Sequence, residues 1–264
     1  MVQRGFEADA TFANENMITF KIGPNGDAVF MVPEGRIRAS SEFADAAMRG
    51  PWQESQERVI ALPEFDKKTF GTYLQWLLTG VVHTKAGCAD GNKSIEARLY
   101  SEILRLPNLS VLGHYLLDND FRDSINDALI ECTADLHRNG SKFPASYGPD
   151  FYDKTPDQSP IRKLVVDLVV WDMREFHVLR LKTDRDTMHP DYIMDLLLAV
   201  SSRLVSGTPG KSPLDGWDTS CKYHCHGDEK PCYRKKADTP RVIPTKRPAS
   251  DEAQSPDAKR QASG

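Results

Sequence analysis

Five potential metal ligands lie close together in the C-terminal part of the sequence. They are the thiol and imidazole side chains of Cys221, His224, Cys225, His226 and Cys232. Zinc in structural sites takes four such ligands in a tetrahedral array. Cys221, His224, His226 and Cys232 would supply the four ligands, with Cys225 as an alternative ligand. We therefore consider this stretch a candidate zinc site, and we expect no other cofactor.

The spacing of these residues also allows an interpretation without metal. Zinc ligands usually follow the patterns C-x2-4-C and H-x3-5-H with a long loop between the pairs, whereas a single residue separates His224 from His226. Such spacing suits a strand or a turn and not the helix of a zinc finger. The alternative is a surface loop whose Trp217 and Tyr223 pack against helices.

No residue pattern typical of an active site is found. The sequence lacks a glycine-rich phosphate-binding loop between a strand and a helix, and it lacks the G-x-S-x-G motif of hydrolases. The other histidines are scattered and have no paired carboxylate. Cys88 is expected to be an exposed ordinary thiol, and Cys132 falls at the spacing of a helix core. We therefore expect no catalytic or cofactor-binding residues and predict that the protein is not an enzyme.

The composition limits the class of protein. The 264 residues, 39% of them hydrophobic and with a mean hydropathy of −0.50, suit one or two soluble domains. No apolar run approaches the roughly 20 residues that span a bilayer, and the N-terminal residues lack a signal-peptide core. We thus expect an intracellular protein, in the nucleus or cytoplasm, with no membrane partner. The formal net charge of −4 argues against direct binding of nucleic acid.

The elements that define the fold are predicted far upstream of the candidate ligands. Two short runs of β-branched and aromatic residues, 17–22 and 28–32, predict strands. Asn25 and Gly26 between them both tolerate positive φ, which indicates a hairpin. A third strand is expected at 58–62.

Helices are predicted around these strands. One is expected to end at Gly50-Pro51, and another to run from the capping residue Asp66 to Gly80. The second has one apolar stripe, formed by Phe70, Tyr73, Leu74, Leu77 and Leu78. Further apolar patterns predict helices that cover one side of the sheet, up to Gly140. The sequence therefore predicts an α+β fold with a small β-sheet covered by a helical cluster.

The order of landmarks in this region resembles the BTB/POZ family, most closely the BTB domain-containing proteins of filamentous fungi. The landmarks are Phe30, Ser41-x-Phe43, Trp52-x-Glu54-Ser55, Val59-x-Ala61-Leu62-Pro63, Phe70 and Leu77-Leu78-Thr79-Gly80-Val81. The resemblance implies a BTB/POZ-like domain over 16–140 and a role in self-association or partner docking.

The resemblance is incomplete at one place. Relatives commonly carry Val-His-Lys after the second strand, where this sequence has Val32-Pro33-Glu34. In relatives such charged positions help to shape the dimer pocket, and Glu34 reverses the charge. We still expect a homodimer, and the apolar pattern of the fold is intact.

The rest of the sequence divides by composition. A flexible arm is expected over 1–15, and a linker with a pair of helices over 141–207. The Cys/His-containing segment occupies 208–236. Residues 237–264 are rich in proline, alanine, serine and charge, which predicts a disordered tail. Basic pairs in this tail, Lys246-Arg247 and Lys259-Arg260, are similar to a bipartite nuclear import signal.

These observations favour a non-catalytic module for protein–protein interaction. The BTB/POZ resemblance implies two roles, a substrate adaptor bound to a cullin-class ubiquitin ligase scaffold or a nuclear scaffold associated with transcription or chromatin. A third hypothesis is a zinc-stabilised binding protein built on the Cys/His-containing segment. The expected partners are other proteins.

Overall fold

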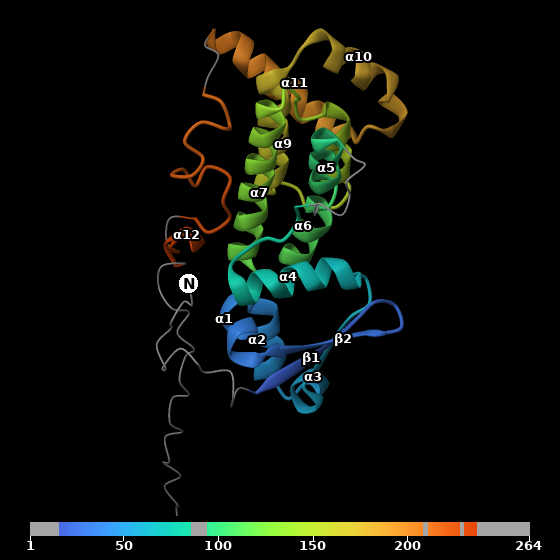
Figure 1. Cartoon of the computed structure of the whole chain (residues 1–264), viewed down its shortest axis with the longest axis vertical. Helices are drawn as coiled ribbons and strands as arrows, with labels where there is room; N and C mark the ends of the chain where they lie inside the picture. The colour runs from blue at the N-terminus through green and yellow to red at the C-terminus, as the bar shows by residue number, and fades with distance from the viewer. Residues whose placement is uncertain (1–15, 86–93, 208–210, 228–229, 237–264) are drawn as a thin grey trace, which may run out of the picture.

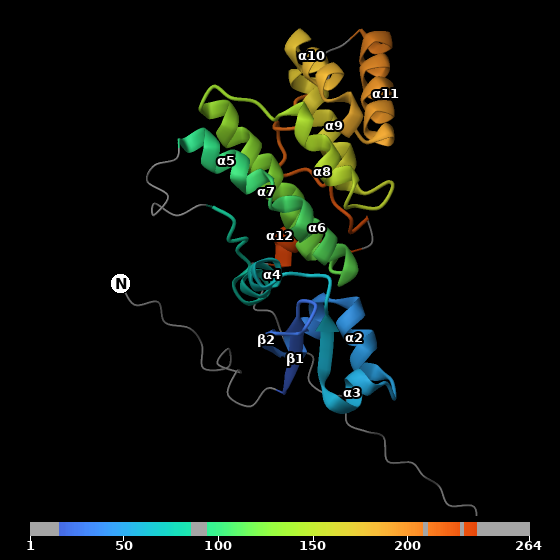
Figure 2. The same cartoon turned by 90° about the vertical axis from the view of Figure 1, so that its right-hand side faces the viewer.

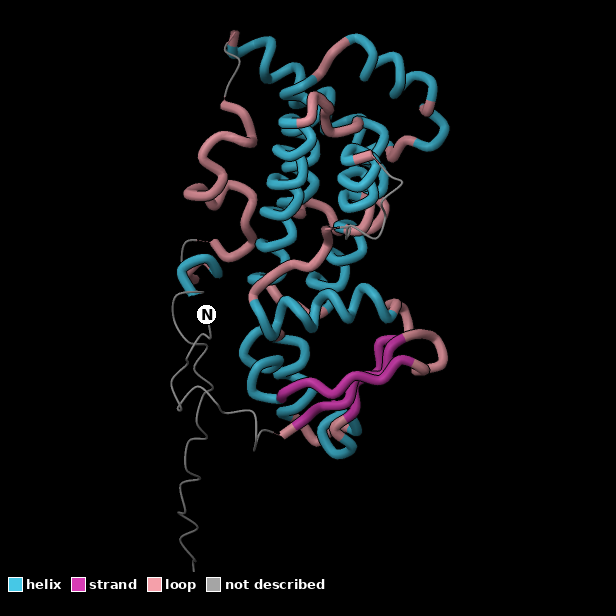
Figure 3. The backbone as a smooth tube through the Cα atoms, in the orientation of Figure 1, coloured by secondary structure: helices cyan, strands magenta, loops and turns pink. Residues whose placement is uncertain are grey.

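Three short strands form a mixed sheet at one end of the molecule (Figure 3). The computed structural model describes residues 16–85, 94–207, 211–227 and 230–236. Strand β1 (Met17–Ile22) lies between β2 (Ala28–Pro33), which is antiparallel to it, and β3 (Val59–Leu62), which is parallel. Gly23 and Gly26 adopt positive φ angles of 93° and 66°, so the predicted hairpin is confirmed. The α+β class is confirmed as well.

The helical stretch after the hairpin is divided at Ser41. Helix α1 (Glu34–Ser40) and helix α2 (Glu42–Arg49) meet there, and α3 (Gln53–Glu57) follows. The Ser41 hydroxyl accepts the amide N–H of Ala44 at 3.0 Å and donates to the carbonyl of Leu116 at 2.5 Å. Ser41 therefore begins α2 and also ties it to a distant helix, a contact that local periodicity does not reveal.

Helix α4 (Lys67–Thr79) lies across the sheet, between the strands and the upper helices (Figure 2). As predicted, Asp66 caps its start: one carboxylate oxygen accepts the amides of Lys68 and Thr69 at 2.8 and 2.9 Å. On its other side α4 contacts α6 (Leu106–Tyr115) and α7 (Asn119–Arg138). The ring centroid of Trp76 lies 4.9 Å from that of Phe121 on α7.

Helix α7 forms the axis of the helical part (Figure 1). It contacts α4, α6, α5 (Ile95–Ile103) and α9 (Pro160–Asp172). The segment between α7 and α9 contains the short helices η4 (Ala145–Tyr147) and α8 (Gly148–Tyr152). Its aromatic side chains Phe143, Phe151 and Tyr152 are buried, as expected if this linker packs onto the helices. One continuous hydrophobic core thus extends from the sheet to the last helices.

The far end of the molecule is built by α10 (Glu175–Thr183), η5 (Arg185–Thr187) and α11 (Pro190–Ser206). The end of α11 before Gly207 agrees with the pair of helices predicted within 141–207, whereas α10 was not predicted because it presents no buried apolar stripe. The last described helix is α12 (Tyr233–Lys236). Among the described residues, no helix combines the length and apolarity needed to cross a membrane.

The predicted arm 1–15 and the predicted tail 237–264 lie outside the described residues, as does Cys88. The basic pairs of the tail therefore have no structural account. Cys132 is buried in the helix core, as predicted.

A buried carboxyl group joins the sheet-side helices to α7. Asp118 is fully buried and accepts the hydroxyls of Ser40 and Tyr73 at 2.6 and 3.0 Å, and its other oxygen accepts the amide of Phe121 at 2.9 Å. Burial raises the pKa of this carboxyl to about 6, although the hydrogen bonds oppose the shift. The folded protein therefore holds this proton to a higher pH than the unfolded chain does.

The Asp118→Asn substitution tests this shift. A carboxyl pKa raised by folding contributes stability below its unfolded value near 4 and loses it as the pH rises through about 6. We expect the unfolding free energy of the native protein, relative to Asp118→Asn, to fall by up to about 3 kcal/mol between pH 4 and 7. Urea denaturation across this range measures the difference, and a constant difference would contradict the shift.

The packing of α11 on α8 gives a second prediction. A Cβ atom at Gly148 would lie 2.1 Å from the ring of Tyr192, whose hydroxyl donates to the carbonyl of Ala145 at 2.8 Å. We expect Gly148→Ala to destabilise the protein by about 1–3 kcal/mol through overpacking. At Gly71 in α4 the nearest atom would be 4.0 Å away, so Gly71→Ala is the control and should stabilise by about 1 kcal/mol. Thermal unfolding of both variants provides the measurement.

Candidate metal centre

The Cys/His-containing segment runs along one side of α7 and ends in α12 (Figures 1 and 3). Tyr223 is buried, its carbonyl accepts the Asn126 amide at 2.6 Å, and its hydroxyl donates to Asp167 at 2.7 Å. Lys222 reaches the same Asp167 carboxylate at 2.8 Å. At its far end, Lys236 forms an ion pair of 2.7 Å with Asp120. The segment is therefore fixed to α7 and α9 at several points.

Asp127 of α7 is the main attachment point. Its carboxylate contacts Nε2 of His224 at 3.1 Å, accepts the hydroxyl of Tyr233 at 2.5 Å and accepts Nε of Arg234 at 2.8 Å. Burial, and then the nearby Asp127 carboxylate, raise the pKa of the Tyr233 hydroxyl well above its usual value. Tyr233 therefore remains a hydrogen-bond donor throughout the neutral range.

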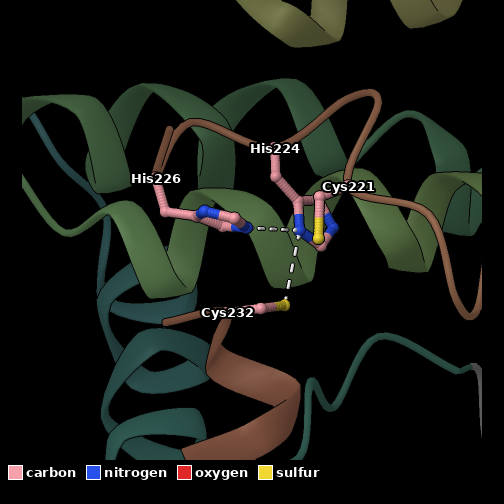
Figure 4. A group of neighbouring side chains, drawn as sticks. All are labelled: Cys221, His224, His226 and Cys232. Carbon is pink, nitrogen blue, oxygen red and sulfur yellow. Dashed lines mark hydrogen bonds between the residues drawn. The ribbon is translucent and has the colours of Figure 1, made fainter. Parts of the chain in front are cut away.

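The four predicted ligands meet at this place. One ligand atom from each of Cys221, His224, His226 and Cys232 lies within 4.8 Å of the others (Figure 4). Nδ1 of His224 is 3.4 Å from Nε2 of His226 and 3.6 Å from Sγ of Cys232. Burial raises the pKa of the Cys232 thiol. Gly227, which follows His226, adopts a positive φ of 64°.

Cys225, the alternative ligand, is not part of this group. Its amide N–H donates to one carboxylate oxygen of Asp123 at 2.5 Å, beside which the thiol also lies. Burial raises the pKa of this thiol to about 12. The backbone contact with Asp123 holds Cys225 outside the group of four ligand atoms.

The polar residues of α7 that position the segment were not predicted from the sequence. Asp123, Asn126 and Asp127 lie at helical spacing on one buried face of α7, although the helical pattern of the sequence indicates only apolar residues and Cys132 as interior. Their polar partners are about one hundred residues away in the sequence. The sequence pattern that could have revealed these residues is a row of aspartates on a predicted core helix, together with the basic residues 234–236, which lie opposite them in the structure.

A hollow beside α7 contains titratable side chains, and its cysteine thiol is not activated as a nucleophile. It has a volume of about 510 Å³ and lies between the end of α4, α5, α7 and the Cys/His-containing segment. Thr84 donates to Glu102 at 2.5 Å, and Lys85 pairs with Glu131 at 3.0 Å. Burial raises the pKa of the Cys132 thiol to about 12, so it is not a nucleophile near neutral pH. This hollow gives no support to an enzymatic function.

Exposed apolar side chains are concentrated on α10 and α11. On α10 they are Phe176, Val178 and Leu179, and on α11 they are Met194, Leu197, Leu198, Leu204 and Val205. The α11 residues share one stripe of the helix, opposite the stripe of Tyr192 and Leu196 that is buried against α8 and α9. Helix α11 is therefore apolar on two sides, of which only one is covered within the described structure.

Comparison with models of known protein families finds no match for the chain, and a search of curated proteins finds no similar sequence either.

The contacts of Asp127 generate a third prediction. The Asp127→Asn variant removes a buried negative charge from opposite Arg234, so we expect a loss of about 2 kcal/mol or more of unfolding free energy. Hydrogen exchange should show faster opening of residues 217–227. The control is Glu131→Gln, four residues further along α7, whose partner Lys85 is exposed; this change should cost less than about 1 kcal/mol. Equal effects of the two substitutions would contradict the role of Asp127.

Proposed function

We propose that this protein is a non-catalytic module for protein–protein interaction, of the BTB/POZ type that the sequence resembles. The observation that carries the proposal is the uncovered apolar stripe of α11. Monomeric proteins rarely expose contiguous apolar surface of this kind unless it receives a partner. The proposed partner is another protein that places its own apolar side chains on this stripe.

Hollows on either side of α11 support this role. One of about 730 Å³ lies between α9 and α11, with Val166, Met194 and Leu198 among its lining and the charged Arg162 and Asp167 beside them. Another of about 490 Å³ includes Leu204 in its lining. An apolar floor with charged edges is the usual form of a groove that accepts an amphipathic helix.

The arrangement of the N-terminal part also fits the proposal. The hairpin, the helices after it, the returning strand β3 and the crossing helix α4 follow the order that the sequence predicts for the region carrying the BTB/POZ landmarks. Glu34 accepts Arg38 at 2.9 Å and also pairs with Arg58. These two contacts lower its pKa, although its partial burial opposes the shift. The negative charge of Glu34 is thus neutralised by two arginines of the same chain. Because it need not repel a second copy, self-association remains part of the proposal.

Two cellular roles remain proposals within this function. As a substrate adaptor of a cullin-class ubiquitin ligase, the protein would bind the ligase scaffold through its N-terminal part and a substrate through α10 and α11. As a nuclear scaffold associated with transcription or chromatin, it would use the same surfaces to join other proteins. The adaptor role requires two separate surfaces, and the sheet end and the α11 end are separate in this molecule (Figure 2).

Charge introduced on the stripe tests the function. The double variant Leu197→Glu/Leu204→Glu should keep its melting temperature and lose self-association or captured partners, because both side chains are exposed and uncovered. Sedimentation velocity measures the mass, and affinity capture followed by mass spectrometry identifies partners. Val81→Glu/Ile95→Glu makes the same change at two exposed apolar residues outside the stripe. The proposal is wrong if both double variants behave like the native protein.

A further inference from the structure

The hydrogen-bond partners of His224 and His226 show which ring nitrogens carry a proton. Nε2 of His224 faces the Asp127 carboxylate at 3.1 Å, and Nδ1 of His226 faces the carbonyl of Gly227 at 2.5 Å. Carboxylates and carbonyls only accept hydrogen bonds, so each of these two nitrogens carries the ring proton. In the neutral rings the other two nitrogens therefore present lone pairs.

These two lone pairs point at the same space. Nδ1 of His224 and Nε2 of His226 are 3.4 Å apart, and the Cys232 sulfur lies 3.6 Å from the first of them (Figure 4). Without a cation, two acceptor nitrogens would repel one another at this distance. In tetrahedral zinc, with Zn–N bonds of about 2.0–2.1 Å and Zn–S bonds of about 2.3 Å, two nitrogens are about 3.3 Å apart and a nitrogen and a sulfur about 3.6 Å. The His224–His226 and His224–Cys232 separations match those of ligands around one ion, and the Cys221 sulfur lies within 4.8 Å of the same atoms.

We propose that Cys221, His224, His226 and Cys232 bind one Zn²⁺ ion. Two thiolates and two imidazoles in a tetrahedral array are the ligand set that zinc prefers. On binding, the thiols of Cys221 and Cys232 each release a proton to solvent, and their two negative charges balance the charge of the ion. The site is thus neutral overall, as suits a pocket where the His224 side chain is only 2% exposed.

The surroundings of the site are those of a built metal centre. Asp127 holds His224 in the same way that a carboxylate orients a zinc-bound histidine, through the nitrogen that does not bind the metal. Asp123 is fully buried, and its oxygen Oδ2 has no hydrogen-bond partner among the described residues. This oxygen lies 3.9 Å from Nδ1 of His224, so a cation at the centre would interact favourably with it. The proposed ion would close the segment 221–232 against α7.

Metal binding by the full chain provides the first test. Protein purified under reducing conditions is stripped with a chelator and titrated with Zn²⁺ in competition with a chromophoric chelator. We expect one ion per chain, and Co²⁺ should give the visible spectrum of a tetrahedral site with thiolate ligands. Less than about a tenth of an equivalent of zinc would overturn the proposal.

Single substitutions separate the proposed ligands from their neighbours. Cys221→Ser and His226→Gln change partly exposed residues, so their folds are expected to be retained, and each should weaken zinc binding by more than about 100-fold. Asp127→Asn should weaken it by about 10–100-fold and keep the tetrahedral Co²⁺ spectrum. Cys225→Ser is the matched control and should bind as the native chain does. If Cys225→Ser lost as much affinity as Cys221→Ser, the ligand assignment would be wrong.

Thiol reactivity gives a readout that does not depend on titration. Cys221 is exposed, so an alkylating reagent should modify it readily in the metal-stripped protein. Zinc should slow this reaction by at least about tenfold, because the bound sulfur is no longer a free nucleophile. Unchanged alkylation of Cys221 at saturating zinc would contradict the proposal.

Discussion

The polar face of α7 is the constraint on which the rest of the helical part depends. Asp123, Asn126 and Asp127 are buried although they lie on a helix that also supplies apolar residues to the core. Buried carboxylates are costly unless other groups compensate them. The Cys/His-containing segment supplies most of that compensation, through the Cys225 amide and the side chains of His224, Tyr233 and Arg234. Its Tyr223 carbonyl accepts the amide of Asn126. The fold is therefore completed by a segment that its sequence pattern alone would allow to be a surface loop.

Much of the N-terminal part could be predicted from the sequence. The hairpin follows from β-branched runs separated by Asn25 and Gly26, and α4 follows from the capping Asp66 and the left-handed Gly80. These features are local, so periodicity and turn chemistry are sufficient to find them. The division of the first helical stretch at Ser41 could not be predicted from local sequence. The carbonyl that accepts the Ser41 hydroxyl belongs to Leu116, 75 residues away.

The candidate metal centre could be predicted in composition but not in detail. Five cysteine and histidine residues in a short stretch indicate zinc, and the geometry selects four of them because the Asp123 carboxylate holds the backbone of Cys225. Despite the unusual spacing, the four ligand atoms meet within 4.8 Å of one another. Helix α10 was not predicted, for a different reason. Its apolar residues Phe176, Val178 and Leu179 are exposed, so they form no core-facing pattern.

The long separation between Asp127 and its partners has a consequence for synthesis of the chain. His224 follows Asp127 by 97 residues and Arg234 follows it by 107. A ribosome adding roughly 5–20 residues per second needs roughly 5–20 s to cover that interval. During this time α7 can form against its earlier neighbours while its acidic face stays in water. The emerging chain is therefore exposed along this face until residues 224–234 are translated, and that interval is when a chaperone would have access to it.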